Sequence, residues 1–296
     1  MNGWTLTKVF EINGRLTVAD TVEEAISIYR RRAPGAEIRN ISQVYGGTDD
    51  YNALIAEPVV YSCQGWDLTH ITFTGVDEWT DIDRLVSIQQ RYPKAEFGVL
   101  MSKHWIENGY RYPSPEFIGN LRGRGLRLSA HLCGSLAREV MRMGGGLLTM
   151  TDDYSPLFDI FQRVQLNVAG YKEIVSCNVE PGMHEEVIIQ QGDDRQLFEQ
   201  CYINSGEHIA ILLDKSGGQG IDTPIVFPAH RVHVGFAGGI NPDNVIDKMK
   251  MITTSQLVGK FWIDMESGVR TDDRFDLDKV EDVCKKVYDE FLTEKG

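Results

Sequence analysis

The sequence has few cysteines, no long apolar run and no excess of positive charge, and each shortage excludes a class of protein. Its five cysteines are scattered and form no Cys-x-x-Cys pair, which argues against a zinc site or a disulfide framework. No apolar run approaches the length of a membrane helix, and the N-terminal stretch has no signal-peptide core. We therefore expect a cytoplasmic protein with no metal, no other cofactor and no membrane partner.

Positive charge is outnumbered by negative charge. The chain carries 30 Lys and Arg against 43 Asp and Glu, a net charge of −13. Nucleic acids and anionic membranes are bound by basic faces, so we expect neither to be the main partner. The composition, 42% hydrophobic and 25% charged over 296 residues, is typical of a soluble globular protein long enough for one large domain and an extra piece. The oligomeric state stays open.

Residues 1–58 have the pattern of a separate small α+β unit. Two strand-like runs, 4–12 and 15–19, flank the turn signal Asn13-Gly14. A capping box that starts at Thr21 predicts a helix, and a third strand is expected at 37–44. This ββαβ extension shows no evident chemistry, and its expected role is packing or the joining of subunits.

From about residue 68, strand patterns alternate with helix patterns, which predicts a parallel sheet. Strands are expected at 70–74, 96–101, 126–131, 164–168, 186–190, 209–214, 232–236 and 261–265. Helices are expected at 81–92, 116–121, 135–143, 156–161, 171–177, 195–203, 242–251 and 277–292. Eight strands with intervening helices favour a (β/α)8 TIM barrel over residues 59–296.

Each of the last three predicted strands ends in glycines. Glycine lets backbone N–H groups approach an anion closely, and successive turns of this kind after the last strands of a barrel are typical of phosphate binding. The candidate phosphate-binding residues are Gly217, Gly218, Gly220, Gly238, Gly239, Ser267 and Gly268.

These turns carry a resemblance to a known family. Residues 236–245 (FAGGINPDNV) resemble the LAGGLxPxNV run of phosphoribosylanthranilate isomerase, and residues 263–269 (IDMESGV) resemble its VDVSSGVE run. Leu212-Leu213-Asp214 with the glycines that follow is similar to the family's LLD…GGTG. The resemblance covers about residues 69–292 and is most specific over the last third. It implies a phosphate-binding TIM barrel.

The resemblance also implies a reaction, the Amadori rearrangement of a phosphoribosyl-arylamine aldose to its amino-ketose. In this family a cysteine thiolate takes the proton from C2 and an aspartic acid protonates the ring oxygen. Asp214 matches the acid, but Thr74 stands in the place of the cysteine, and a threonine hydroxyl is too weak an acid to serve as base unaided. The arginine that binds the substrate carboxylate in the family has no direct match; Lys103 and Arg111 lie on the corresponding loop.

Strand alternation suggests a replacement for the missing base. His131 and Cys133 share a face at the end of the third barrel strand, and a cysteine near a histidine can be held as thiolate. We therefore expect His131 or Cys133 to act as base; the alternatives are a hydrogen-bonded core histidine and a buried apolar cysteine. Asn167 and Asp264 are further candidates for the same mouth, where this fold places its catalytic residues.

The sequence predicts an isomerase of a phosphorylated sugar. Two alternatives stay open beside it. In the first, a divergent barrel binds a phosphorylated ligand without turnover or acts as a related lyase or epimerase. In the second, the barrel has no function of its own and residues 1–58 carry the function of an interaction protein. If the protein is an isomerase or a divergent phosphate-binding barrel, its partner is a small phosphorylated molecule.

Overall fold

The structure is a computed structural model and describes residues 8–12, 15–19, 26, 41–45, 66–103, 111–142, 155–167, 186–191, 209–214, 220–222, 225, 233–254 and 259–292. The chain divides into two compact units, Met1–Tyr61 and Ser62–Gly296. The sequence-based boundary between 58 and 59 lies just before this division.

The first unit contains a three-stranded antiparallel sheet. Strands β1 (Lys8–Ile12) and β2 (Arg15–Ala19) form a hairpin, and β3 (Ile41–Tyr45) pairs with the other edge of β1. The order is therefore β2-β1-β3. Most of the helix expected after Thr21 lies outside the described residues.

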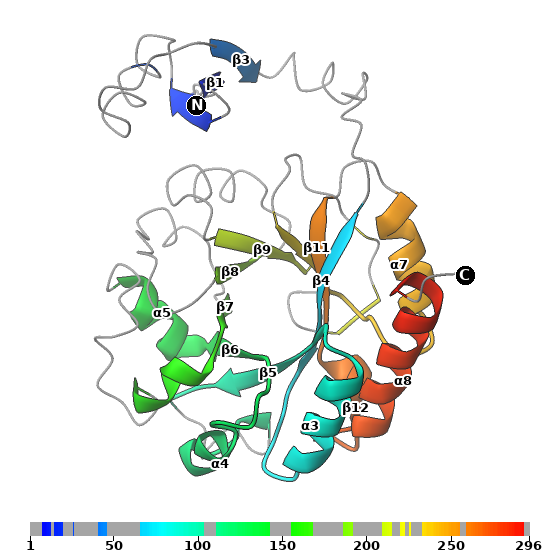
Figure 1. Cartoon of the computed structure of the whole chain (residues 1–296). Coiled ribbons are helices and arrows are strands. Elements are labelled where there is room, and N and C mark those ends of the chain that lie inside the picture. Colours follow the sequence, from blue (N-terminus) through cyan, green and yellow to red (C-terminus); the bar gives the residue numbers. More distant parts are fainter. Residues whose placement is uncertain are drawn as a thin grey trace. The chain divides into compact units, whose positions relative to one another are not determined.

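The second unit is a closed barrel of eight parallel strands (Figure 1). The strands are β4 (Asp67–Thr74), β5 (Ala95–Met101), β6 (Leu128–Cys133), β7 (Arg163–Asn167), β8 (Glu186–Gln191), β9 (Ile209–Leu213), β10 (Val234–Phe236) and β11 (Lys260–Met265). Neighbours in sequence are neighbours in the barrel, and β11 closes it against β4. Each predicted strand is present within a few residues of its expected bounds, and the predicted (β/α)8 barrel is confirmed.

Helices follow the strands around the outside (Figure 1). The described α-helices are α3 (Ile82–Arg91), α4 (Pro115–Asn120), α5 (Gly134–Arg142), α7 (Val245–Thr254) and α8 (Leu277–Val287). Side chains that accept backbone N–H groups fix three of their starts, at Asp81, Ser114 and Asp276. The helices expected at 171–177 and 195–203 lie outside the described residues.

Three helix predictions were wrong in detail. The helix expected at 242–251 begins only at Val245, because Asn241 Oδ1 accepts the N–H groups of Asp243 (2.8 Å) and Asn244 (3.2 Å) and holds a turn there. The segment expected as a helix at 156–161 is a 3-10 helix, η3 (Ser155–Ile160). The end of the helix expected at 277–292 is a π-helical turn, η6 (Tyr288–Leu292).

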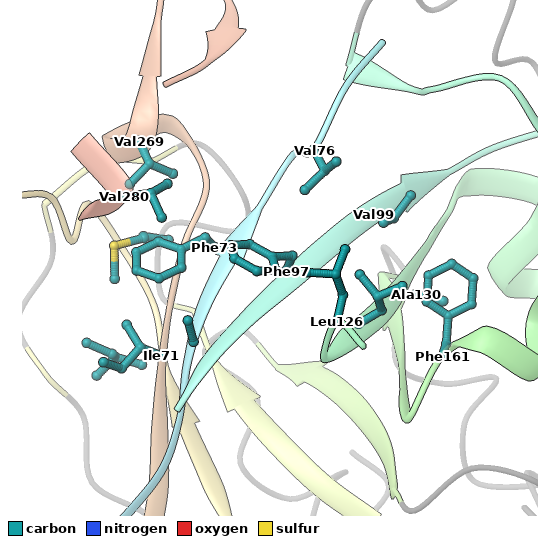
Figure 2. Packing of buried hydrophobic residues seen from close by; sticks show 14 of the residues in the cluster. Ile71, Phe73, Val76, Phe97, Val99, Leu126, Ala130, Phe161, Val269 and Val280 are labelled. Atoms are coloured by element: carbon teal, nitrogen blue, oxygen red, sulfur yellow. The ribbon is translucent and has the colours of Figure 1, made fainter. Parts of the chain in front are cut away.

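The main hydrophobic core lies between the outer faces of the strands and the helices. Side chains alternate along a strand, so Ile71 and Phe73 of β4 pack outward while Thr72 and Thr74 face the barrel interior. Figure 2 shows the outward packing around Phe73 and Phe97, whose ring centroids are 6.4 Å apart. Many of the interior side chains are polar, although bulky branched residues usually fill the interior of this fold; a small apolar cluster of Ile188, Ala210, Leu212 and Trp262 lies apart from the main core.

Candidate active site at the carboxyl ends of the barrel strands

Three predicted site residues meet inside the barrel mouth. Thr74 Oγ1 donates a hydrogen bond to Asp264 Oδ1 (2.9 Å) and lies 3.4 Å from His131 Nδ1. Thr74 and His131 come from β4 and β6, which are separated by β5. Gly98 of β5 makes room for this contact, because a Cβ there would lie 2.6 Å from Thr74 Oγ1 and 2.8 Å from His131 Nε2. We call Thr74, His131 and Asp264 the carboxyl-end cluster.

Burial sets the protonation states in this cluster. It lowers the pKa of His131 to about 4, although the negative charge of Glu96 acts in the opposite direction. It raises the pKa of Asp264 to about 8; the hydrogen bond from Thr74 opposes this shift, and the charges of Glu96 and Glu266 add to it. At neutral pH a neutral imidazole therefore lies close to a protonated carboxyl group.

Cys133 belongs to a separate group of side chains. Asn167 Nδ2 lies 3.4 Å from Cys133 Sγ, and Gln165 Nε2 donates to Asn167 Oδ1 (2.8 Å). Sγ lies 3.6 Å from the main-chain oxygen of His131. Burial raises the pKa of the Cys133 thiol, and the hydrogen bonds from Asn167 and Tyr112 lower it by less. Cys133 is therefore a thiol at neutral pH, and this geometry does not favour the thiolate considered from the sequence.

Asp214 follows β9 at its carboxyl end and is buried, with 4% of its surface exposed. Gln190 Nε2 of β8 donates to Asp214 Oδ2 (2.8 Å). Gln190 was not predicted as a site residue. Alternation from buried Ile188 would have indicated that it faces inward.

Arg111 is held by two carboxylates at the rim of the mouth. Its Nη1 lies 3.1 Å from Glu266 Oε1 and its Nε lies 2.8 Å from Asp273 Oδ1. Glu266, two residues beyond Asp264 on the same strand face, was not among the predicted site residues. The other predicted cation, Lys103, is exposed on the loop after β5.

The loops that follow β9, β10 and β11 pack against one another. A Cβ at Gly220 would overlap the Ser267 side chain, and a Cβ at Gly239 would overlap the backbone of Asp222. Both glycines have positive φ, +65° and +67°, a region that other residues rarely adopt. Close loop packing is therefore one physical reason for glycine at these positions.

Gly268 extends the same packing to the β11 loop, because a Cβ there would overlap the carbonyl oxygen of Ile240. Gly238 also has positive φ, +106°. The structure thus brings together the described members of the predicted phosphate-binding set, Gly220, Gly238, Gly239, Ser267 and Gly268. Gly217 and Gly218 lie outside the described residues.

A second polar cluster fills the amino-terminal half of the barrel. Arg163 Nη1 lies 2.9 Å from Glu96 Oε1, and its Nε lies 2.9 Å from Glu186 Oε2. Glu186 Oε1 lies 2.6 Å from His233 Nδ1, and the Arg163 guanidinium lies 4.2 Å from the ring centroid of Trp262. This amino-end cluster was not predicted from the sequence, although strand alternation marks its members as inward-facing.

The residues that the structure describes contain no candidate metal site and no candidate membrane span. Among them, no group of three or more His, Cys, Asp or Glu side chains is arranged to hold a metal ion. Within the same residues, no helix is both long enough and apolar enough to span a membrane.

Comparison with known proteins gives one family match. The family model for N-(5'-phosphoribosyl)anthranilate (PRA) isomerase matches residues 179–286, which include β8 to β11 and the glycine loops. No curated protein matches.

Among solved structures, TrpF from Jonesia denitrificans is 16% identical; the match covers 73% of this chain and 95% of that one, with a TM-score of 0.48. N-(5'-phosphoribosyl)anthranilate isomerase from Pyrococcus furiosus is 16% identical; the match covers 75% of this chain and 99% of that one, with a TM-score of 0.46. A phosphoribosylanthranilate isomerase in complex with reduced 1-(o-carboxyphenylamino)-1-deoxyribulose 5-phosphate is 18% identical, covering 74% and 97%, with a TM-score of 0.45. This chain has a closed eight-stranded parallel barrel, and over residues 179–286 it is similar to the phosphoribosylanthranilate isomerase family.

Proposed function

We propose that this protein isomerises a phosphorylated aldosylamine to the corresponding amino-ketose by general acid–base catalysis. One observation carries the proposal: the ring of His131 lies 3.4 Å from the side chain of Thr74. Thr74 stands where the family has its catalytic cysteine, so His131 reaches the same part of the mouth from β6. The base is then supplied by a different strand.

His131 has the properties that proton abstraction requires. It is 1% exposed, and burial lowers its pKa to about 4, so its imidazole is neutral and can accept a proton at neutral pH. The negative charge of Glu96 acts in favour of the protonated ring. In the proposed reaction the ring oxygen is protonated, the C1–O bond breaks and the nitrogen lone pair forms a C1=N bond. His131 then takes the proton from C2, the C2–H electron pair forms a C1=C2 bond and the C1=N pair returns to nitrogen, and the resulting enol tautomerises to the amino-ketose.

Asp214 is the proposed acid that protonates the ring oxygen. It lies at the carboxyl end of β9, and the amide of Gln190 orients its carboxyl group at 2.8 Å. Asp264 and Asn167 are proposed to orient substrate hydroxyl groups, and Cys133 lines the same side. Proton transfer of this kind requires no cofactor, and a soluble phosphorylated metabolite fits a cytoplasmic protein.

The substrate phosphate is proposed to lie at the packed glycine loops. The support is the convergence of Gly220, Gly239 and Gly268 at the carboxyl ends of neighbouring strands, which is the usual phosphate position in this fold. Gly217, Gly218, Gly238 and Ser267 complete the proposed set. Lys103 and Arg111 are the proposed cations at the other side of the mouth.

The test is turnover. Purified protein is incubated with a series of aldosylamine 5-phosphates, N-(5'-phosphoribosyl)anthranilate among them, and the amino-ketose product is separated by chromatography. Conversion of at least one compound, lost in His131→Asn and in Asp214→Asn, supports the proposal. Conversion that persists in His131→Asn removes His131 as base and leaves Cys133 to be tested by Cys133→Ala.

A binding protein without turnover is the second candidate, because Thr74 cannot replace a thiolate. A thermal shift with ribose 5-phosphate and no conversion of any aldosylamine phosphate would select this candidate. If no phosphorylated compound shifts the melting temperature, both the isomerase and the binding protein are excluded.

A further inference from the structure

Three acidic side chains lie at the reacting end of the mouth. Asp214 follows β9, Asp264 lies near the end of β11, and Glu266 follows two residues later. Burial raises the pKa of Glu266; the charge of Arg111 lowers it, and the charges of Asp214 and Asp273 raise it further. These carboxyl groups are therefore close enough to influence one another.

The arginines at this end are already paired. Arg111 contacts Glu266 at 3.1 Å and Asp273 at 2.8 Å. Arg270, which is 6% exposed, donates to the Gly75 carbonyl oxygen at 2.8 Å and lies 3.3 Å from Asp77. A ligand carboxylate would have to displace one of these partners before it could bind either guanidinium group.

Two buried oxygen atoms at the level of His131 have no hydrogen-bond partner in the part of the chain that the structure describes. They are Gln165 Oε1 and Asp264 Oδ2, on residues 3% and 5% exposed. Gln165 is the register partner of His131, and Asp264 is one hydrogen bond from Thr74. Since Gln165 already donates to Asn167 through Nε2, its oxygen is the atom left for a ligand. Gln165 Oε1 requires a hydrogen-bond donor, whereas Asp264 Oδ2 carries the proton of its carboxyl group and can donate to a ligand oxygen.

We infer that the end of the substrate opposite its phosphate carries hydroxyl or amino groups and no carboxylate. The inference rests on the proposed function and narrows its substrate class. A hydroxyl group can donate to Gln165 Oε1 and accept from Asp264 Oδ2, and an ammonium group can donate to Gln165 Oε1. A carboxylate in the same position would place a like charge near Glu266 and leave Gln165 Oε1 without a donor.

Three compounds with one carbon skeleton test the inference: ribitol 5-phosphate, 1-amino-1-deoxyribitol 5-phosphate and 5-phosphoribonate. Their ends are a hydroxyl, an amine and a carboxylate. We expect the first two to bind the full-length protein at least about tenfold more tightly than the third in calorimetry. Equal or tighter binding of 5-phosphoribonate overturns the inference and leaves the proposed function standing. If none of the three compounds binds, both the inference and the proposed function are overturned.

A double variant tests the assignment of Arg111. Glu266→Gln with Asp273→Asn frees the guanidinium group, so we expect affinity for 5-phosphoribonate to rise about tenfold relative to ribitol 5-phosphate. Asp83→Asn is the matched control, because Asp83 pairs with Arg124 on the exposed side of α3; it should leave the ratio unchanged. An unchanged ratio in the double variant contradicts the assignment of Arg111 to this end of the substrate.

Discussion

The two ends of the barrel interior use polar side chains in different ways. At the amino end, Arg163 lies between Glu96 and Glu186, so two carboxylates share one buried cation. At the carboxyl end, Asp264 meets a hydroxyl group and His131 lies beside Thr74, and among the described residues no charge of opposite sign is in contact with either. The amino end is built as an ionic network, and the carboxyl end keeps groups able to gain or lose a proton.

This difference shows how a barrel can have a polar interior and still keep a site for chemistry. A buried charge is tolerated when its partner is buried with it. The amino end pairs its charges across strands, and the carboxyl end has a lowered His131 pKa and a raised Asp264 pKa of the kind that accompany catalysis. Variants at the two ends should therefore fail in different ways.

The largest expected effect is the loss of chemistry at the carboxyl end. His131→Asn keeps a polar atom near Thr74 but removes the proton acceptor, so kcat for an aldosylamine phosphate should fall about 100- to 10,000-fold. Initial rates give this value, and circular dichroism checks that the fold is retained. Cys133→Ala is the comparison variant, and a larger loss there than in His131→Asn would make Cys133 the base.

The largest effect on stability is expected at the amino end. Arg163→Met leaves Glu96 and Glu186 buried without their cation, so the free energy of unfolding should fall by about 3–5 kcal/mol. Urea unfolding measures it. Arg124→Met is the matched control, because Arg124 is paired but 41% exposed, against 1% for Arg163, and should cost at most about 1 kcal/mol. Equal losses in the two variants would contradict an ionic role for the amino-end cluster.

A smaller effect is expected at Gly98, which lies against the carboxyl-end cluster. Gly98→Ala places a methyl group 2.6 Å from Thr74 Oγ1 and 2.8 Å from His131 Nε2, so these side chains must separate. Overpacking of this kind costs about 1–3 kcal/mol of unfolding free energy, and turnover should fall with it. Gly123→Ala is unsuitable as a control because of its positive φ; Gly259→Ala is suitable, since nothing lies near a Cβ there. Full activity in Gly98→Ala would mean that the contact between Thr74 and His131 is dispensable.

Much of the fold followed from local patterns. The barrel strands are short, apolar on their outer face and separated by turn signals, so alternation placed all eight within a few residues. Helix starts were harder to predict. Pro242 suggested the first turn of a helix, but the Asn241 side chain competes for the backbone N–H groups of 243 and 244 and delays α7 to Val245.

The candidate site was predicted less completely than the fold. Inward-facing residues could be found by counting along a strand, which placed His131, Asn167 and Asp264 correctly on the interior. Which of them meet depends on strand stagger and on small residues such as Gly98, and no local pattern encodes either. For the same reason, the contacts of Gln190 with Asp214 and of Glu266 with Arg111 could not be predicted from strand alternation.

The most gradual expected effect is a slope with pH, and it distinguishes a protonated Asp264 from an ionised one. Its pKa of about 8 in the folded protein is far above the ordinary value of an aspartic acid in the unfolded chain. Between about pH 4 and pH 8 the folded state holds a proton that the unfolded state has released, so stability falls as the pH rises, by at most about 1.4 kcal/mol per pH unit. Above the folded pKa this slope disappears. In Asp264→Asn the group cannot titrate, so the difference in unfolding free energy between the two proteins should shift in favour of the variant from pH 5 to pH 8. A difference independent of pH in urea titrations would mean that Asp264 is ionised in the native barrel, in which case a cation or donor close to Oδ2 must compensate for its charge.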